Sequence, residues 1–211
     1  MSVTYVHNAQ LDRADVAGIA DVHWRCLPRS GLRRLGKGIL EPLYRTLRDH
    51  DHGILIAARH RGQIIGFVSG TTHLRSIYVA FLRRHFLRAS FALAPRLLSP
   101  GMFRRIIETA LYPFRRGGRR QDLAGLPRAE LLSIAVTDAW RGKGVAAGLY
   151  TRLTAEVQER GAPAFKIVAG EALRRAHRFY RKMGAERVAE LAVHKGERSF
   201  VYIQRVEAPD A

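Results

Sequence analysis

Apolar residues near the start of the chain recur at the spacing of an amphipathic helix. The stripe consists of Val16, Ile19, Ala20, His23 and Leu27. Asp12 stands before the stripe as an N-cap and Pro28 follows it as a stop, so the pattern predicts one helix between them. A second, short helix is predicted over about Gly38 to Leu47.

Runs of strand length follow this helical part. Ile54 to Ala58 and Ile64 to Thr71 flank the polar segment Arg59-His-Arg-Gly-Gln63, which we interpret as the turn of an antiparallel hairpin. Later in the chain we expect strands at 131–136, 164–168, 187–193 and 199–206, and helices at 144–160 and 172–183 with Gly184 as a stop. The strand, helix and strand within 131–168 imply a right-handed parallel crossover in an otherwise antiparallel sheet. The pattern therefore predicts a mixed α/β (α+β) fold.

Residues 73 to 126 differ from the rest in composition, because they hold eleven arginines against Glu108 and Asp122. Their apolar residues recur at helical spacing in two groups: Leu82, Phe86, Ala89, Leu93 and Leu97, then Phe103, Ile106, Ala110 and Phe114. Pro100-Gly101 separates the two groups. We interpret this block as a helical insertion that ends in the basic loop Arg115-Arg-Gly-Gly-Arg-Arg120.

The length of 211 residues and the apolar share of 47% suit one domain, which we expect to span residues 1–211 with the insertion at about 73–126. The single Cys26 excludes an internal disulfide and a cysteine-rich zinc site, and the nine histidines show no metal-ligand spacing, so no metal is expected. The beginning of the sequence lacks a signal-peptide pattern, and no stretch approaches the roughly 20 apolar residues of a membrane span. We therefore expect a cytoplasmic protein, in which residues 86–98 could at most contact a membrane peripherally.

The charge is strongly positive, with 36 basic and 18 acidic residues giving a formal +18, and 31 of the basic residues are arginine. Such a balance favours anionic partners, and nucleic acid, anionic lipid and phosphorylated small molecules all fit it. A codon bias toward arginine would produce the same count without selection for a ligand. Composition alone leaves these alternatives open.

The chemistry is concentrated where a predicted strand passes through glycines into a predicted helix, within Leu131 to Ala147. Unpaired backbone N–H groups from Gly142 onward, the helix dipole and Arg141 all suit a pyrophosphate group. Glycine at 142 and 144 lets the backbone approach phosphates closely.

Two familiar phosphate-binding patterns fit this turn poorly. A Walker loop requires Ser or Thr after its lysine, whereas Lys143 is followed by Gly144. The form Gly-x-Gly-x-x-Ala at 142–147 matches a dinucleotide fingerprint, but a dinucleotide fold needs several parallel units and only one crossover is predicted.

A third pattern joins the turn to a later helix. The turn Arg141-Gly-Lys-Gly-Val-Ala146 reads Arg-x-x-Gly-x-Ala, and Ala176-His-Arg-Phe-Tyr-Arg-Lys-Met-Gly184 follows about thirty residues later. This combination resembles the GNAT superfamily of acetyl-CoA-dependent N-acetyltransferases, most closely over residues 130–206. The sequence departs from the family pattern at Leu173, where many relatives have an asparagine, and at Ala185, where a phenylalanine is usual.

The resemblance implies a mostly antiparallel sheet, flanked by helices, whose two central parallel strands splay apart to admit acetyl-CoA as co-substrate. It implies that the pantetheine arm runs along Ile134, Ala135 and Val136, and that the pyrophosphate lies on Arg141, Gly142, Lys143, Gly144, Val145 and Ala146. An extended arm would add to the strand edge like a short β-strand, and strand-edge amides can polarise the thioester carbonyl.

The resemblance also implies two catalytic residues. Tyr180 stands where relatives commonly protonate the departing sulfur, with a plain core aromatic as the alternative. Glu130 stands where some relatives hold a catalytic glutamate and would act as the base, directly or through a water, with a solvated strand-end residue as the alternative. Cys26 has no histidine and acid pairing in the sequence, so we expect direct transfer in a ternary complex and no acetyl-cysteine.

The sequence thus favours a small-molecule N-acetyltransferase with an anionic amine acceptor. A nucleotide-linked amino sugar is preferred by analogy with relatives that carry an arginine-rich helical insertion. The alternatives are a protein or peptide amine, and a non-catalytic module that binds nucleic acid or anionic membrane. Nucleic acid is disfavoured because aromatic residues do not alternate with the arginines. The insertion could instead be a lid or a dimer surface, which leaves a homodimer open.

Overall fold

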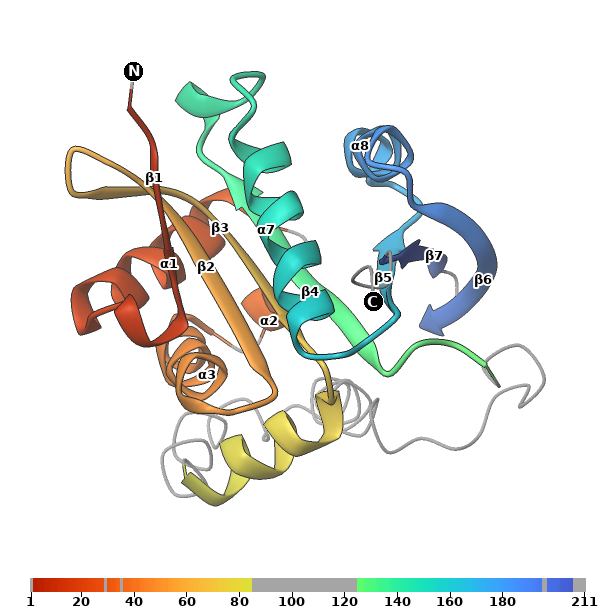
Figure 1. Cartoon of the computed structure of the whole chain (residues 1–211), viewed down its shortest axis with the longest axis horizontal. Helices are drawn as coiled ribbons and strands as arrows, with labels where there is room; N and C mark the ends of the chain where they lie inside the picture. Colours follow the sequence, from red (N-terminus) through yellow and green to blue (C-terminus); the bar gives the residue numbers. More distant parts are fainter. Residues whose placement is uncertain (1, 29, 35, 85–124, 195–196, 207–211) are drawn as a thin grey trace.

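The computed structural model describes residues 2–28, 30–34, 36–84, 125–194 and 197–206, and its centre is a seven-stranded sheet in the order β1-β2-β3-β4-β5-β7-β6 (Figure 1). The strands are β1 (Thr4–His7), β2 (Gly53–His60), β3 (Gln63–Thr71), β4 (Ala129–Val136), β5 (Ala164–Gly170), β6 (Glu186–His194) and β7 (Glu197–Arg205). The α-helices with both ends described are α1 (Arg13–Cys26), α2 (Gly31–Arg34), α3 (Lys37–Asp49), α7 (Val145–Glu159) and α8 (Arg174–Lys182). Short 3₁₀ turns cover Asn8–Gln10 and Asp138–Trp140.

Every neighbouring strand pair is antiparallel except β4 and β5, which are parallel. This confirms the mixed sheet and the single parallel crossover predicted from the sequence. Strand β1, which pairs with β2 at one edge, and the short helix α2 were not predicted. Each has only four residues, too few for a periodic apolar pattern to stand out.

Helix α1 begins where the sequence predicted. The Asp12 side chain accepts a hydrogen bond from the backbone N–H of Asp15, and the Asp15 side chain accepts one from the N–H of Asp12. Asp15 is also buried and ion-paired with Arg59 of β2. The reciprocal cap therefore fixes the start of α1, and the ion pair with Arg59 ties that start to the sheet.

The hairpin between β2 and β3 is tighter than predicted. Its turn consists of Arg61 and Gly62, with φ angles of 49° and 77°, as a two-residue turn with both central residues left-handed requires. The five residues Arg59 to Gln63, expected as a loop, instead include the last residues of β2 and the first of β3. The mainly polar side chains concealed these strand ends.

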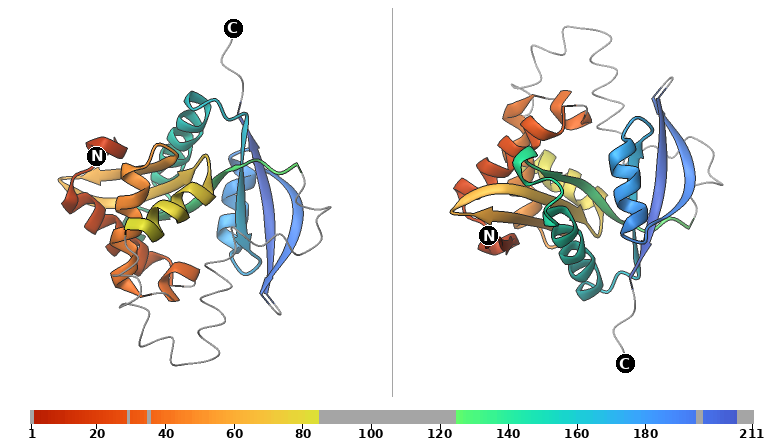
Figure 2. Two further views of the ribbon diagram at one scale, coloured as in Figure 1. Left: turned by 90° about the horizontal axis from the view of Figure 1, so that it is seen from below. Right: turned by 90° about the horizontal axis from the view of Figure 1, so that it is seen from above.

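Helices cover both faces of the sheet (Figures 1 and 2). Helices α1 and α3 pack on one face, where Val16, Ile19 and Leu40 are fully buried. Helix α7 covers the other face with Leu149 and Leu153.

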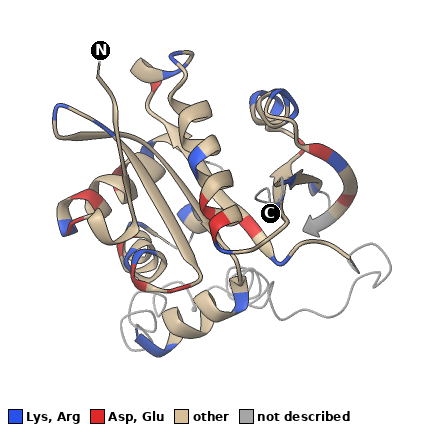
Figure 3. Ribbon diagram, in the orientation of Figure 1, with Lys and Arg blue, Asp and Glu red and all other residues tan. Residues whose placement is uncertain are grey.

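Helix α8 packs beside β5, β6 and β7. His177 and Tyr180 point into the protein, and the ring of His177 stacks on that of Tyr202 in β7 with centroids 5.8 Å apart. The opposite face of α8 carries only exposed arginines and Lys182, seen as the blue helix in Figure 3.

The two central strands pair over a short length only. The parallel register of β4 and β5 covers Ala129–Phe165, Glu130–Lys166 and Leu131–Ile167. Beyond Leu131, β4 continues to Val136 beside β3, and β5 continues to Gly170 beside β7. The sheet therefore splits after Leu131, and α7 and α8 stand on the two sides of the split (Figure 2).

The segment after β3 begins with helix, because residues 74–84 are helical. Ile77 is buried against the face covered by α1 and α3, whereas Leu82 is 45% exposed. The expected apolar stripes from Phe86 to Phe114 and the basic loop Arg115–Arg120 lie outside the described residues. Within the described part of the chain, no helix is long and apolar enough to cross a membrane.

Candidate active site

The split leaves one edge of β4 without a neighbouring strand. The N–H of Thr137 donates to the carbonyl of Ile65 in a 2.9 Å bond, and the register continues with Ala135 opposite Phe67. Backbone groups along a strand alternate between its two edges, so Ala135 faces β3 while Ile134 and Val136 face the split. Of the three residues expected along the pantetheine arm, two turn their backbone N–H and C=O groups toward the opening.

The glycine turn lies at the end of this strand and leads into α7. Gly142 and Gly144 have φ angles of 77° and 79°, and residues 141–144 are all exposed. No side chain caps α7, and a Cβ atom at either glycine would meet nothing within 4 Å. The backbone N–H groups at the N-terminus of α7 are thus free of side-chain caps and open to a ligand. The buried side chain of Val145 holds this end of the helix against the core.

Charged and aromatic side chains brace the turn. Arg141 pairs with Asp138 at 2.5 Å, and the Lys143 ammonium lies 5.1 Å from the centre of the Trp140 ring. Trp140 in turn packs against His60 of β2, with ring centroids 4.7 Å apart. Trp140 therefore packs against side chains on both the turn and β2.

Tyr180 is buried on the inner face of α8, 6% exposed. Its ring lies 5.8 Å from that of Tyr202 and 6.4 Å from that of Tyr150. Burial, with a smaller contribution from the charge of Tyr202, raises the pKa of Tyr180 above its ordinary value. The hydroxyl therefore keeps its proton at neutral pH and can donate it.

Glu130 is also buried, so the alternative of a solvated strand-end residue does not hold. Only 7% of the residue is exposed, because the strand pairs with β3 and β5 on both sides at this position. Its Oε2 atom lies 3.3 Å from Nζ of Lys166 and makes no hydrogen bond within the described structure. Burial raises the pKa of Glu130, and the positive charge of Lys166 opposes this rise.

Two neighbours of Glu130 were missed by sequence reasoning. Lys166 is the polar residue between buried Phe165 and Ile167 in β5, and that alternation was the available signal. Tyr78 comes from the helix at 74–84, and burial together with the negative charge of Glu130 raises its pKa to about 12. No local pattern in the sequence connects Tyr78 to β4.

A series of buried, hydrogen-bonded polar side chains lies between the sheet and helices α1 and α3. Ser30 Oγ lies 2.7 Å from Nε2 of His23, and the Tyr44 hydroxyl lies 2.5 Å from Nδ1 of that ring. The Tyr44 hydroxyl further interacts with the side chains of Ser69 and Ser133, the latter on β4. Burial, helped by the charge of Arg33, lowers the pKa of His23 to about 4, so the ring is neutral at neutral pH.

The match to known proteins decides the family. The model of the acetyltransferase (GNAT) family matches residues 17–185. This chain belongs to the GNAT acetyltransferase family. It is accordingly an acyltransferase. None of the curated proteins compared matches the sequence.

Solved structures of acetyltransferases share this fold. An aminoglycoside 6'-N-acetyltransferase complexed with coenzyme A has a TM-score of 0.61 at 12% identity, with all of both chains covered. The ribosomal-protein-S18-alanine N-acetyltransferase from Escherichia coli has a TM-score of 0.58 at 12% identity, covering 99% of this chain and 97% of the other. NAA60 from Arabidopsis thaliana in complex with acetyl-CoA has a TM-score of 0.58 at 13% identity, covering 97% and 99%.

The two departures from the GNAT pattern occupy different environments. Leu173 precedes α8 as its N-cap residue and is 44% exposed. Ala185 is buried at 4% exposure, after Gly184 whose φ of 88° ends the helix. Among the described residues, no group of three or more His, Cys, Asp or Glu side chains is arranged to hold a metal ion.

Proposed function

We propose that this GNAT acetyltransferase moves the acetyl group of acetyl-CoA to a primary amine by direct transfer in a ternary complex. The observation that carries the proposal is the open edge of β4. Ile134 and Val136 present peptide groups there, because β5 no longer pairs with β4 after Leu131. An extended pantetheine arm could hydrogen-bond to these groups in place of a neighbouring strand. The pyrophosphate would lie on residues 141–146, against the free donors at the start of α7.

The reaction requires two proton movements that the buried groups can supply. Glu130, directly or through a water, takes a proton from the acceptor ammonium and leaves an uncharged nitrogen. The nitrogen attacks the thioester carbonyl, the C–N bond forms and the C–S bond breaks. Tyr180 protonates the departing thiolate and recovers a proton released by the nitrogen. The nitrogen gives up two protons in total, of which one ends on sulfur and one reaches solvent.

The acceptor we propose is a small anionic amine, with a nucleotide-linked amino sugar as the favoured member. Its support is the formal charge of +18 and the arginines of residues 73–126, which precede β4 in the sequence. Helix 74–84 brings the beginning of that segment to Glu130 through Tyr78. A protein or peptide amine is the second candidate, since two of the similar structures are an S18-alanine N-acetyltransferase and an NAA60 protein.

Thiol release from acetyl-CoA tests the proposal. The panel contains amino sugars, their nucleotide conjugates, polyamines and peptides, each at several concentrations. We expect the highest kcat/KM with a nucleotide-linked amino sugar. A higher kcat/KM with peptides would instead identify a protein or peptide amine as the acceptor. No turnover with any amine would favour the binding module, whose affinity for nucleic acid or anionic vesicles would fall steeply with salt.

A further inference from the structure

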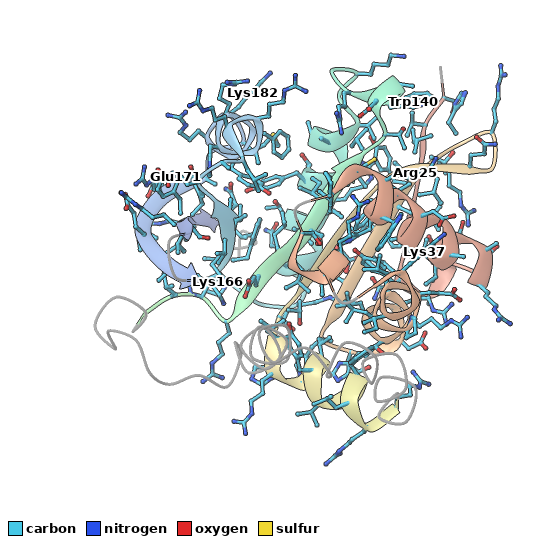
Figure 4. The ribbon with its side chains drawn as sticks, turned by 180° about the vertical axis from the view of Figure 1, so that it is seen from behind. Arg25, Lys37, Trp140, Lys166, Glu171 and Lys182 are labelled. Carbon is cyan, nitrogen blue, oxygen red and sulfur yellow. The ribbon has the colours of Figure 1, made fainter. Side chains whose placement is uncertain are left out.

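The ion pair between Lys166 and Glu130 is an unusual feature of the centre of the sheet. Parallel register places the two residues directly beside each other, one pair before the strands separate after Leu131. Both side chains are largely withdrawn from water, with exposures of 19% for Lys166 and 8% for Glu130. Figure 4 shows Lys166 near one end of β4 and Trp140 near the other.

We propose that Lys166 is a positioning residue for the reaction, whose ammonium group holds the buried Glu130 side chain in the ionised, proton-accepting form. This inference rests on the proposed role of Glu130 as the base. Lys166 would not touch the acceptor or the coenzyme in this role. It would act only through the carboxylate 3.3 Å away.

The geometry explains why the carboxylate needs such a partner. A carboxylate taken out of water prefers to be neutral, and a neutral carboxyl group cannot accept a proton from an ammonium ion. An ammonium group at ion-pair distance opposes that preference, because its positive charge stabilises the carboxylate. Oε2 is buried and makes no hydrogen bond in the described structure, so the ammonium group 3.3 Å away is its compensating polar neighbour.

The position of the ammonium group is fixed independently of Glu130. Nζ of Lys166 donates a 2.9 Å hydrogen bond to the carbonyl of Pro127. This bond holds the charge beside the carboxylate even after Glu130 has accepted a proton. The positive charge then favours loss of that proton toward solvent, which the partly exposed lysine side chain reaches.

Among the residues that the structure describes, Lys166 is the group whose charge shifts the pKa of Glu130. The groups identified as facing it are Lys166 from β5, the Tyr78 phenol from helix 74–84 and Thr71 from β3. The phenol is neutral at the pH values of interest because burial raises its pKa to about 12, and threonine does not titrate in this range. Lys166 is therefore the group to change.

The experiment measures kcat/KM as a function of pH for Lys166→Met, Lys166→Arg and the unaltered enzyme, using the best acceptor from the panel. Activity requires the ionised carboxylate, so it falls as the pH drops below the pKa of Glu130. Removing the neighbouring positive charge raises that pKa, and the acidic limb of the profile should move upward by about one to three pH units. Lys166→Arg should restore the limb to within about half a unit.

Lys37→Met is the matched control. Lys37 of α3 forms an exposed ion pair at 2.7 Å with Asp21 of α1, so the same substitution removes a lysine and breaks a pair between two helices and not within the sheet. Its profile should coincide with that of the unaltered enzyme. A folded Lys166→Met enzyme with an unmoved acidic limb and only a lower melting temperature would overturn the proposal, because the pair would then be structural.

A second measurement covers the case in which Lys166→Met does not fold. Infrared difference spectra of the unaltered protein against Glu130→Gln report the protonated carboxyl band of Glu130 as a function of pH. We expect that band to be absent at pH 7, and its presence there would overturn the proposal. If Glu130→Gln keeps full turnover, the base assignment and the role of Lys166 both fail, whereas acetyl transfer itself remains measurable by thiol release.

Discussion

The ring of Tyr150 on α7 lies 6.4 Å from the ring of Tyr180 on α8. These two rings meet from opposite sides of the split in the sheet. The Tyr150 hydroxyl also donates a 2.9 Å hydrogen bond to Gln204 of β7, so α7 is joined to the half of the sheet that carries α8. The helix that begins at the glycine turn is therefore packed directly against the proposed acid.

Tyr180→Phe should lower kcat at least tenfold, about 1.4 kcal/mol, while acetyl-CoA affinity changes little. Only the hydroxyl is lost, and the ring keeps its contacts with Tyr150 and Tyr202. Steady-state kinetics and calorimetry separate the two effects. Tyr150→Phe is the matched control, since it removes a neighbouring hydroxyl with no proposed chemistry. An unimpaired rate in Tyr180→Phe would return this tyrosine to the core.

Gly144→Val should weaken acetyl-CoA binding about tenfold or more. The branched side chain would occupy the open space in front of the α7 donors, and φ at this position is 79°. Gly161→Val supplies the control, because Gly161 follows the other end of α7 with a φ of 72° and equally open surroundings. Both variants should lose similar thermal stability. Calorimetry that finds unchanged affinity in Gly144→Val would remove the turn from the coenzyme site.

His23 should make the protein sensitive to acid. Its pKa is about 4 in the fold and near 6.5 in the unfolded chain, so the folded state binds fewer protons between these values. The stabilisation is complete above pH 6.5 and is lost as the pH falls toward 4, by roughly 3 kcal/mol in all. Urea unfolding at pH 7, 6, 5 and 4 measures this slope. His23→Gln, which does not titrate, should show a clearly shallower slope, and an equal slope would assign the acid sensitivity elsewhere.

Exchanging Arg115, Arg116, Arg119 and Arg120 together for glutamine should raise the acceptor KM and leave kcat and acetyl-CoA affinity little changed. These residues lie outside the described part of the chain, so the prediction rests on their position in the sequence. A contact that stabilises the bound acceptor and the transition state equally has this kinetic signature when it is lost. The salt dependence of acceptor binding should also become weaker, because salt screens contacts between exposed charges. An unchanged KM together with loss of a dimer in sedimentation would instead make this segment a partner surface.

Local patterns were sufficient to predict the main elements and the turn. The stripe from Val16 to Leu27 predicted a buried face, and the ring of His23 within it is fully buried. Gly142 and Gly144 predicted an open backbone at the start of a helix, and both have the left-handed φ that this needs. Such features depend on neighbours within a few residues, which a sequence displays directly.

The surroundings of Glu130 depend instead on strand register and on a distant helix. Lys166 meets Glu130 because two parallel strands pair in one register, and a shift by one residue would have turned the lysine away. Tyr78, 52 residues before Glu130 in the sequence, lies close enough for the negative charge of Glu130 to raise its pKa. The burial of Glu130 was not predicted for this reason, since its position at the start of a strand said nothing about what covers it.

The pairing of Thr71 with Glu130 has a consequence for how this enzyme can evolve. The long segment between β3 and β4 leaves and re-enters the sheet at adjacent positions, so its ends are held together whatever its length. Doubling such a loop costs only about 0.6 kcal/mol in closure entropy. Glu130 and Val136 lie at opposite ends of β4, roughly 20 Å apart at strand spacing. Mutation and selection could therefore exchange the segment between β3 and β4 for another and so change the proposed acceptor. The proposed acetyl-CoA site at the other end of β4 would be inherited unchanged.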